Sequence, residues 1–565
     1  MPKSEIEIDG RPFEITRNLE LALRYLRLQR TELRLWADSI SINQDDTEER
    51  NRHVRYMRSI YSAANETTIF LGEATEGSDA LLHAMDRSKV DIALATTKNA
   101  VVKSLMNASG LSKTELMEKA FEILWRRYWR RIWIFQEIVV SDNPWVQCGR
   151  VKVRWELFCQ ALIALFHSDV KQWGAGYDNE PKWRLEDTYW ERRAYRYSQG
   201  LTESLPKWDM ASGYEFKDRT RLLDLLVTKR GSEASDSRDM VFALAGIASK
   251  PADWDPVSIT YEKSVLLVYM KYVMQLSYVG IQLTAKCSVA KYLIEHDGSY
   301  EVLSHAGQHQ HQRLKKIQPH HQYGHPSWAP DWRIPSDYKD KIVDWIPPPP
   351  SEDRIAKSHI FLEEYGILVC VGQVFDHIHS ISDGEEVKMH PSSIGRVSWN
   401  KWHRRKLIEH GVLSHLGTKL GTVTSLFARM HPLTYRRKLA QTKGGTLCLV
   451  PRDAQAGDLI CQFTGSPIPF ILRPWGEEHW KRKDIGPCSK LIVKFLEWIT
   501  KSTTRIFALD YVNEKISAAL KNKVRKEDVE IQHYTLIGEC FVDGLMNEEK
   551  SAIGDEQQNV AFALH

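Results

Sequence analysis

Residues 33–72 alternate between strand-type and helix-type patterns, and this alternation limits the fold of the amino-terminal part of the chain. The stretch 33–42, LRLWADSISI, is typical of a buried strand, and 67–72, TTIFLG, is typical of a second short strand. Between them, apolar side chains share one helical face: Val54, Met57, Ile60 and Tyr61. Strand, helix and strand with short links favour a parallel sheet flanked by helices, so we predict an α/β domain here.

The flanking segments extend this prediction. Residues 5–16 alternate about Asp9-Gly10, which predicts a hairpin, and 17–29 has a helical leucine pattern. The run 43–50, NQDDTEER, supplies cap-type residues and acids for the start of the next helix. Residues 80–138 are typical of helices.

The chain of 565 residues is too long for one hydrophobic core, so we predict three regions. They are an α/β domain at 1–150, a mixed α+β and mainly helical middle at 151–345, and a β-rich region at 351–565 with a helical insert around 400–440. The polyproline run in 345–354 marks the second boundary.

Composition excludes several classes of protein. The net charge of +4 does not require a nucleic-acid partner, and no apolar run approaches the roughly 18 residues that span a bilayer. The first residues contain no apolar signal segment, and the eight cysteines contain no C-x-x-C pair. We therefore expect a soluble cytoplasmic protein without a structural metal site.

Two basic stretches have alternative interpretations. Arginines and aromatics interleave in 125–131, a pattern that nucleic-acid binding could use, but we favour an amphipathic helix with a solvated basic face. Six histidines lie between 305 and 325, and we favour a surface loop over a metal site because no carboxylate or cysteine completes a ligand spacing.

The segment 130–140, RRIWIFQEIVV, places one carboxylate, Glu137, among bulky apolar side chains. A core segment does not need that charge, and a solvated face does not need so much aliphatic bulk. The pattern indicates a carboxylate held in an apolar wall.

Several segments resemble fungal heterokaryon-incompatibility (HET) domains. Residues 35–72 resemble the family block written roughly L-W-I-D-x-x-C-I-N-Q-x-D-x-x-E-R, and the R-x-W-x-x-Q-E block is matched by Arg131, Trp133, Gln136 and Glu137. The stretches 225–248, 325–335, 436–474 and 534–546 also look like such proteins. The resemblance implies a signalling and interaction module in non-self recognition and programmed cell death, with other incompatibility proteins or a second copy as partners.

The chain departs from the family pattern at two places. The family's opening strand, of the type S-Y-x-W-G, has no counterpart before residue 5, and Ser41 stands where the family has a cysteine. We therefore expect an N-terminally truncated HET domain whose first strand is missing, if Met1 is the true start.

HET domains are distantly similar to TIR domains, some of which hydrolyse NAD⁺ with a glutamate in a W-x-x-x-E arrangement. By this resemblance the fold is a TIR-like parallel sheet, NAD⁺ is a possible substrate and no cofactor is required. Trp133 and Glu137 match the arrangement, and on a helix these two positions share a face. A carboxylate there could stabilise the ribosyl cation that forms as the nicotinamide bond breaks.

Other candidate residues follow from the same resemblance. Asp38 would lie at the carboxyl end of a strand, where ligands of open α/β sheets bind, or would be a turn aspartate. Asn43 and Gln44, with Asp45, could contact a ligand, although helix capping is the role we favour. Arg50 could contact phosphates or form a surface ion pair.

Glu137 also has a structural interpretation, in which it pairs with Arg130 or Arg131. Because the opening strand has no counterpart, we favour this interpretation. The HET signalling module is therefore the predicted function, and NAD⁺ hydrolysis by Glu137 is the alternative.

Overall fold

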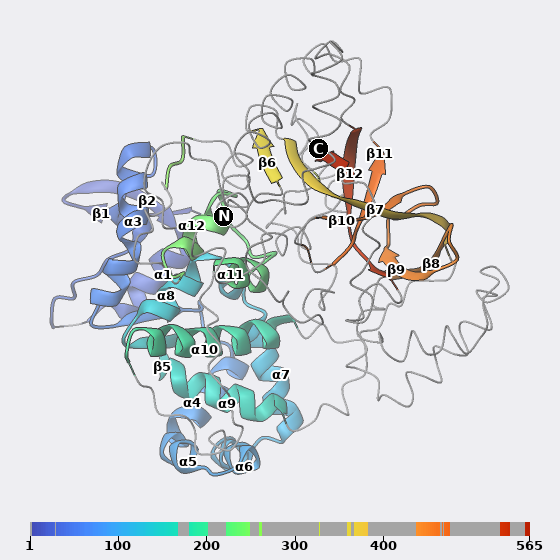
Figure 1. The fold of residues 1–565 in the computed structure, drawn as a ribbon. Helices are drawn as coiled ribbons and strands as arrows, with labels where there is room; N and C mark the ends of the chain where they lie inside the picture. The colour runs from blue at the N-terminus through green and yellow to red at the C-terminus, as the bar shows by residue number, and fades with distance from the viewer. Residues whose placement is uncertain are drawn as a thin grey trace. The chain divides into compact units, whose positions relative to one another are not determined.

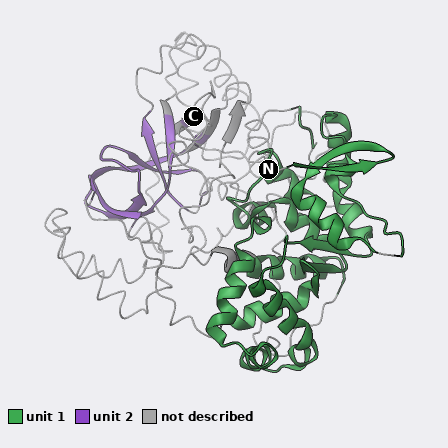
Figure 2. Cartoon of the chain, turned by 180° about the vertical axis from the view of Figure 1, so that it is seen from behind, with its two compact units in different colours: residues 1–250, 255–265 green, residues 251–254, 266–565 purple. Residues whose placement is uncertain are grey.

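The structure is a computed structural model that describes residues 3–28, 30–167, 180–201, 222–248, 259–262, 327, 359–362, 367–381, 437–463, 466, 468–474, 532–542 and 560–564. The chain divides into two compact units (Figures 1 and 2). Unit 1 comprises residues 1–250 and 255–265, and unit 2 comprises 251–254 and 266–565.

Unit 1 begins with the predicted hairpin. Strands β1 (Lys3–Ile8) and β2 (Arg11–Thr16) pair in antiparallel register, and Asp9 and Gly10 both have positive φ, at 51° and 75°. Two positive φ values give a turn whose twist matches the strands, and glycine adopts the second without strain. Thr16 then caps α1 (Arg17–Leu26), because its side chain accepts from the backbone N–H of Leu19 at 3.3 Å.

A three-stranded sheet lies further along unit 1. It has the order β3 (Thr67–Phe70), β4 (Pro144–Cys148), β5 (Val151–Arg154), with β3 and β4 parallel and β4 and β5 antiparallel. The sheet is therefore mixed, and the predicted parallel arrangement holds for β3 and β4 only.

The strand predicted at 33–42 is wrong. Residues 33–37 have no regular secondary structure, and Asp38–Ser41 forms a single helical turn, α2. The Asp38 carboxylate accepts from the backbone N–H of Ser39 at 2.7 Å. Such local bonds from aspartate compete with strand pairing, and here they prevail.

Helices make up most of unit 1. Helix α3 (Thr47–Ala63) is capped by Asp46, whose carboxylate accepts from the N–H groups of Glu48 and Glu49 at 2.9 and 3.0 Å. The cap is thus Asp46, one residue beyond the predicted Asn43–Asp45. Val54 and Met57 are buried, which confirms the predicted apolar face. The other helices are α4 (Glu76–Arg87), α5 (Lys89–Leu94), α6 (Lys98–Ser109), α7 (Lys113–Leu124), α8 (Trp133–Val140), α9 (Trp155–His167), α10 (Glu180–Ser198), α11 (Leu222–Thr228) and α12 (Asp239–Ala245).

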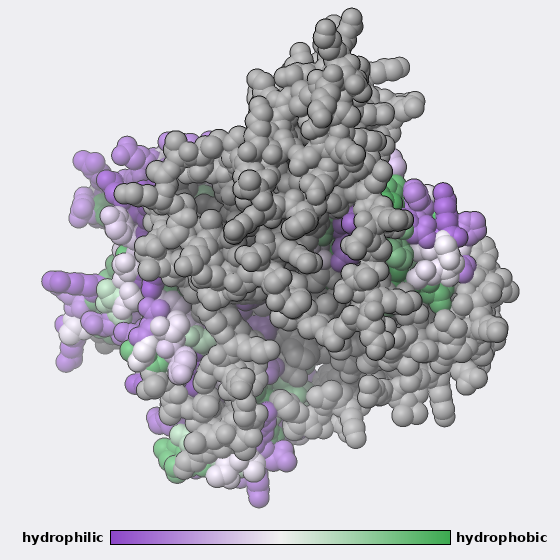
Figure 3. Space-filling model, viewed as in Figure 1, coloured by the Kyte–Doolittle hydropathy of each residue, from purple (hydrophilic) through white to green (hydrophobic). Residues whose placement is uncertain are grey.

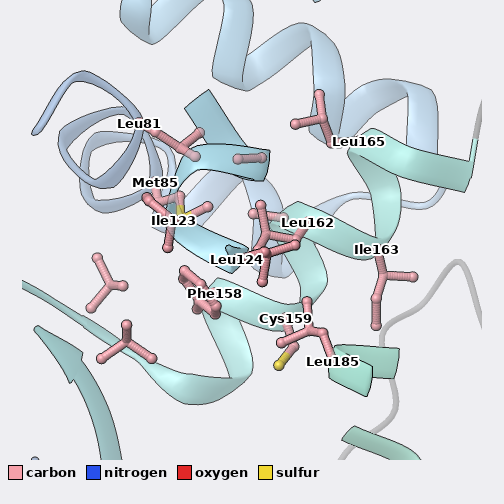
Figure 4. Close-up of a cluster of buried hydrophobic side chains, with 14 of the residues drawn as sticks. Leu81, Met85, Ile123, Leu124, Phe158, Cys159, Leu162, Ile163, Leu165 and Leu185 are labelled. Carbon is pink, nitrogen blue, oxygen red and sulfur yellow. The ribbon is translucent and has the colours of Figure 1, made fainter. Parts of the chain in front are cut away.

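The main core of unit 1 forms between these helices and the sheet. Helix α9 contributes a fully apolar row, including Phe158 and Leu162, that faces Leu81 of α4 and Ile123 of α7 (Figure 4). Trp129 stacks on Phe158 with ring centroids 5.8 Å apart. The core therefore extends beyond residue 150 into the region predicted as the middle part.

The continuous helix predicted through 125–131 is wrong. Helix α7 ends at Leu124, a 3₁₀ turn covers Arg127–Arg130, and α8 starts at Trp133. Arg126 donates to the carbonyl oxygens of Leu71 and Glu73 at 3.0 and 2.8 Å. This arginine therefore binds backbone next to β3 and is not part of a solvated face.

The described part of unit 2 is β-rich, as predicted. Its strands are β6 (His359–Leu362), β7 (Ile367–Ile381), β8 (Arg437–Thr442), β9 (Leu447–Pro451), β10 (Leu459–Phe463), β11 (Phe470–Pro474), β12 (Gln532–Glu539), β13 (Phe541–Val542) and β14 (Val560–Leu564). The predicted helical insert around 400–440 lies outside the described residues, except that 437–440 belong to β8. The histidine-rich and polyproline stretches lie outside them as well.

Five of these strands close into a ring. β7 pairs with β10, and pairing continues through β11, β12 and β14 back to β7. Closure brings β7 and β10 very close at Gly372, where a Cβ atom would lie 2.3 Å from the carbonyl oxygen of Gln462. A closed ring leaves these strands without a free edge.

Among the described residues of both units, none of the helices is long and apolar enough to cross a membrane.

Candidate functional site

Helix α8 carries Trp133 and Glu137, and both of its ends are fixed by residues far away in sequence. Before the helix, the backbone of Glu233 bonds to that of Arg130 and Ile132 at 2.5 and 3.0 Å. After it, the buried guanidinium of Arg192 in α10 donates to the carbonyl oxygens of Ile138 and Ser141, both at 2.6 Å. These bonds satisfy the last carbonyls of the helix and fix its position.

Glu137 is half-buried and accepts hydrogen bonds from two phenols. The hydroxyl of Tyr128 donates to Oε2 of Glu137 at 2.5 Å, and Tyr61 of α3 makes a second side-chain bond to this carboxylate. The rings of Tyr61 and Trp36 meet edge to face, with centroids 5.6 Å apart. The carboxylate predicted to lie in an apolar wall therefore lies among aromatic side chains.

The charges around Glu137 oppose one another. Burial raises the pKa of Glu137, and the nearby charge of Asp38 adds to this, while Arg131 and the two phenol bonds lower it. The net pKa of Glu137 is raised. Burial and then the Glu137 charge raise the pKa of Tyr61 and of Tyr128 well above the usual value, so both phenols keep the protons that they donate.

Arg131 is the cation of this cluster. Desolvation lowers the pKa of Arg131, but Glu137 and Tyr128 raise it further, and the net pKa is raised. Among the described residues, no ion pair within 4.0 Å joins Glu137 to Arg130 or Arg131, and Arg130 lies 3.9 Å from Glu233 instead. The structural interpretation of Glu137 therefore holds only as a charge effect of Arg131.

Trp133 lies one turn before Glu137 on α8 but has different partners. Its side chain makes a hydrogen bond with Asp239, the first residue of α12. The hydroxyl of Tyr261 also donates to Asp239. Burial raises the pKa of Asp239 although both of these bonds lower it.

Arg50 lies near Asp239, the residue to which Trp133 bonds. Its guanidinium lies 3.2 Å from Asp236 and 4.0 Å from Asp239, and its Cζ atom lies 3.5 Å from the ring centroid of Tyr261. Arg238 also bonds to Asp236, at 2.7 Å. Burial raises the pKa of Asp236, but the bonds and charges of Arg238 and the charge of Arg50 outweigh it and leave the pKa lowered.

The remaining predicted residues lie between α2 and α3. Asp38 is half-buried and close enough to Glu137 for its charge to raise that pKa. Asn43 and Gln44 are exposed in the turn before α3, where the Asn43 side chain accepts from the N–H of Asp45 at 3.2 Å. Asn43 itself donates from its backbone N–H to Glu49 at 3.0 Å.

The structure thus arranges the predicted residues in three places: Asp38 beside Glu137, Arg50 joined to Trp133 through Asp239, and Asn43 with Gln44 in an exposed turn. Sequence reasoning missed Tyr61 and Tyr128 as partners of Glu137, because both were assigned to apolar helix faces. It also missed Asp239, although a lone acid directly before the apolar run MVFALAGIA was a visible signal.

The arrangement can hold a carboxylate of raised pKa beside two phenols and a guanidinium. Such a carboxylate can exchange a proton at a pH closer to neutrality than an ordinary glutamate does. It can also stabilise a nearby cation. Among the described residues, no group of three or more His, Cys, Asp or Glu side chains could hold a metal ion.

Unit 1 is therefore an α/β module built around a mixed sheet. Its short helix α8 carries Trp133 and Glu137, whose polar contacts are described above. Residues 1–137 match the profile of the family described as Heterokaryon incompatibility protein (HET). The amino-terminal part of the chain is therefore similar to HET domains, and the matched region ends at Glu137.

One curated relative agrees with this family. The chain is 24% identical over 371 residues to "Heterokaryon incompatibility protein 6, OR allele" of Neurospora crassa. The alignment covers 59% of this chain and 51% of the relative, so the chain spans about half the length of the curated protein that it matches. No solved structure matches the chain.

Proposed function

We propose that this chain acts in fungal heterokaryon incompatibility, as a signalling and interaction module in non-self recognition and regulated cell death. The proposal rests on the R-x-W-x-x-Q-E block, whose side chains all make contacts within unit 1. The charge of Glu137 raises the pKa of Arg131, Trp133 bonds to Asp239, and Gln136 packs where Gly246 leaves room for it. The name of the Neurospora crassa relative supports the same role.

Its partners are other incompatibility proteins or a second copy of the chain, and its place of action is the cytoplasm. The experiment is a fusion assay between fungal strains with and without the chain, which scores the survival of the fused cells. Expression of the intact chain should kill or arrest the fused cells of an incompatible pairing. Equal survival of carrier and deletion strains in every pairing would contradict the proposed function.

NAD⁺ hydrolysis by Glu137 is the second candidate. The observation that favours it is the half-buried carboxylate of raised pKa on the helix that also carries Trp133. The TIR resemblance supports the same idea. The phenol bonds of Tyr61 and Tyr128 count against it, because they occupy part of the carboxylate that a ribose would need.

Nicotinamide release from NAD⁺ by the purified full chain separates the two candidates. If Glu137 is catalytic, Glu137→Gln abolishes release, and Cys148→Ala, which changes a buried thiol of the same unit, does not. Release that is absent in the unchanged chain, together with cell death that survives Glu137→Gln, leaves only the signalling role.

A further inference from the structure

Unit 1 leaves two strand-type segments without the partners that such segments usually have. The hairpin β1–β2 is a two-stranded sheet that pairs with no third strand among the described residues. Residues 33–37, whose sequence is typical of a strand, lie outside every sheet. A two-stranded hairpin is marginally stable in water, and its free edges can accept a further strand.

The hairpin is acidic and incompletely covered. Glu5 and Glu7 of β1 project from the same side of the strand, and both are exposed. No ion pair to either glutamate is present in the described part of the chain, whereas Glu14 pairs with Lys3. On the opposite side of the hairpin, Phe13 is 38% exposed.

The segment from Arg27 to Leu35 has a net positive charge, because its three arginines outnumber its one acid, Glu32. Leu28, Leu33 and Leu35 are 51%, 50% and 42% exposed. The arginines between and beside them are exposed too: Arg27, Arg30 and Arg34. None of these three arginines has an ion pair in the part of the chain that the structure describes.

Large apolar side chains grouped on a surface indicate a binding site more often than a free surface. On the flank of unit 1 that carries β1 and β2, hydrophobic surface lies among hydrophilic side chains (Figure 3). Leucines that alternate with arginines suit an acidic strand edge, because backbone pairing and charge pairing then act together.

We propose that residues 30–35 of one copy of this chain, with Arg27 and Leu28, dock on the β1–β2 hairpin of a second copy. The second copy is the occupant because one chain carries both complementary surfaces, acidic on the hairpin and basic on the segment. Two such contacts, related by a two-fold axis, close into a dimer without leaving either surface free. This inference rests on the proposed function, for which it names the homotypic partner.

The test is sedimentation of the full chain over a range of concentrations. The unchanged chain forms dimers, and Arg34→Glu or the pair Glu5→Arg with Glu7→Arg weakens dimerisation at least tenfold. Mixing the two charge-reversed proteins restores a heterodimer, since one of its two contacts regains opposite charges. Higher salt weakens the unchanged dimer, because the charges are exposed.

Leu33→Glu with Leu35→Glu tests the apolar part of the surface. The matched control is Leu94→Glu on α5, which alters a leucine that is 60% exposed outside the proposed surface. The double change gives monomers and the control leaves dimers, while circular dichroism shows all variants folded. A monomeric unchanged chain, or a dimer that none of the changes at the proposed surface weakens, overturns the inference.

The fusion assay keeps this inference separate from the proposed function. Cell death caused by a chain that stays monomeric would contradict the homotypic contact and support the incompatibility role. A dimer with the expected charge dependence but no effect on fused cells would support the homotypic contact and contradict the incompatibility role.

Discussion

The phenol of Tyr128 donates a hydrogen bond of 2.5 Å to Oε2 of Glu137. The two residues lie on either side of the break between the 3₁₀ turn and α8, so the bond ties these two elements together. Because Tyr61 bonds to the same carboxylate, α3 is joined to them as well. Glu137 is therefore the point at which three segments of unit 1 share one acceptor.

The raised pKa of Glu137 predicts how stability depends on pH. Its folded-state pKa lies above the ordinary 4.5, so the folded state holds the proton more tightly than the unfolded state. The resulting stability is complete below pH 4.5 and is lost as pH rises through the raised value. Calorimetry of the full chain from acidic to neutral pH should show this loss, and Glu137→Gln should remove it.

Glu115 provides a control of opposite sign. Hydrogen bonds from the side chain and backbone of Ser112 lower the pKa of Glu115, so its contribution is present above pH 4.5 and is lost on acidification. Glu115→Gln should therefore flatten the acid side of the profile. Identical pH profiles for the unchanged chain and Glu137→Gln would show that the Glu137 pKa is not raised.

Arg192 predicts a large structural effect away from the Glu137 carboxylate. Its buried guanidinium donates to the carbonyls of Ile138, Val139 and Ser141, which end α8. In Arg192→Leu these carbonyls lose their partner, and we expect unit 1 to lose about 3 kcal/mol or more of stability. Hydrogen exchange should then speed up in α8.

Arg24→Leu is the matched control, because Arg24 is 77% exposed and its one ion pair among the described residues is with Glu20, one turn earlier in α1. Exposed pairs of this kind contribute roughly 0.5 kcal/mol or less. Equal losses in the two variants would mean that Arg192 does not hold the end of α8.

Local patterns predicted the elements of unit 1 well where one short-range interaction decides the structure. The Asp9-Gly10 turn needs positive φ at both residues, and α3 needs an acid at its start, so both were visible in the sequence. The strand predicted at 33–42 was wrong: besides the local Asp38 bond, no strand among the described residues lies beside this stretch. Strand formation depends on such a neighbour, and sequence alone did not show its absence.

The sequence named candidate residues but did not give their arrangement. Trp133 and Glu137 do share a helix, as the spacing indicated. Asp239 lies about a hundred residues after its partner Trp133, and Tyr61 lies about seventy-five residues before its partner Glu137. Such contacts depend on tertiary packing, which periodicity cannot report. Closure of the β-ring in unit 2 was missed for the same reason.

Gly246 predicts a steric conflict inside unit 1. A Cβ atom at Gly246 would lie 2.6 Å from Nε2 of Gln136, and Gln136 is almost completely buried. The glycine has ordinary helical φ, so the expected loss of about 1–3 kcal/mol in Gly246→Ala comes from overpacking alone. Thermal unfolding measures the loss.

The second variant for this contact is Gly246→Ala combined with Gln136→Ala. Removing the amide gives the new methyl group room, so the double variant should lose less than the sum of the two single losses. Strict additivity would show that the two positions do not touch.

Gly372 predicts the same kind of conflict in unit 2, with a backbone atom in place of a side chain. A Cβ atom at this position of β7 would lie 2.3 Å from the carbonyl oxygen of Gln462 and 2.8 Å from Cα of Phe463. Backbone cannot move aside like a side-chain end, so Gly372→Ala should separate β7 from β10 and open the ring. We expect a loss above about 3 kcal/mol and faster hydrogen exchange in both strands.

Gly457→Ala is the control, because its φ of 92° disfavours alanine while nothing lies within 4 Å of the added Cβ. It should cost only about 1 kcal/mol and leave exchange in β7 unchanged, since strain at one residue does not force the strands apart. If the two variants behave alike, the close approach of β7 and β10 does not hold the ring closed.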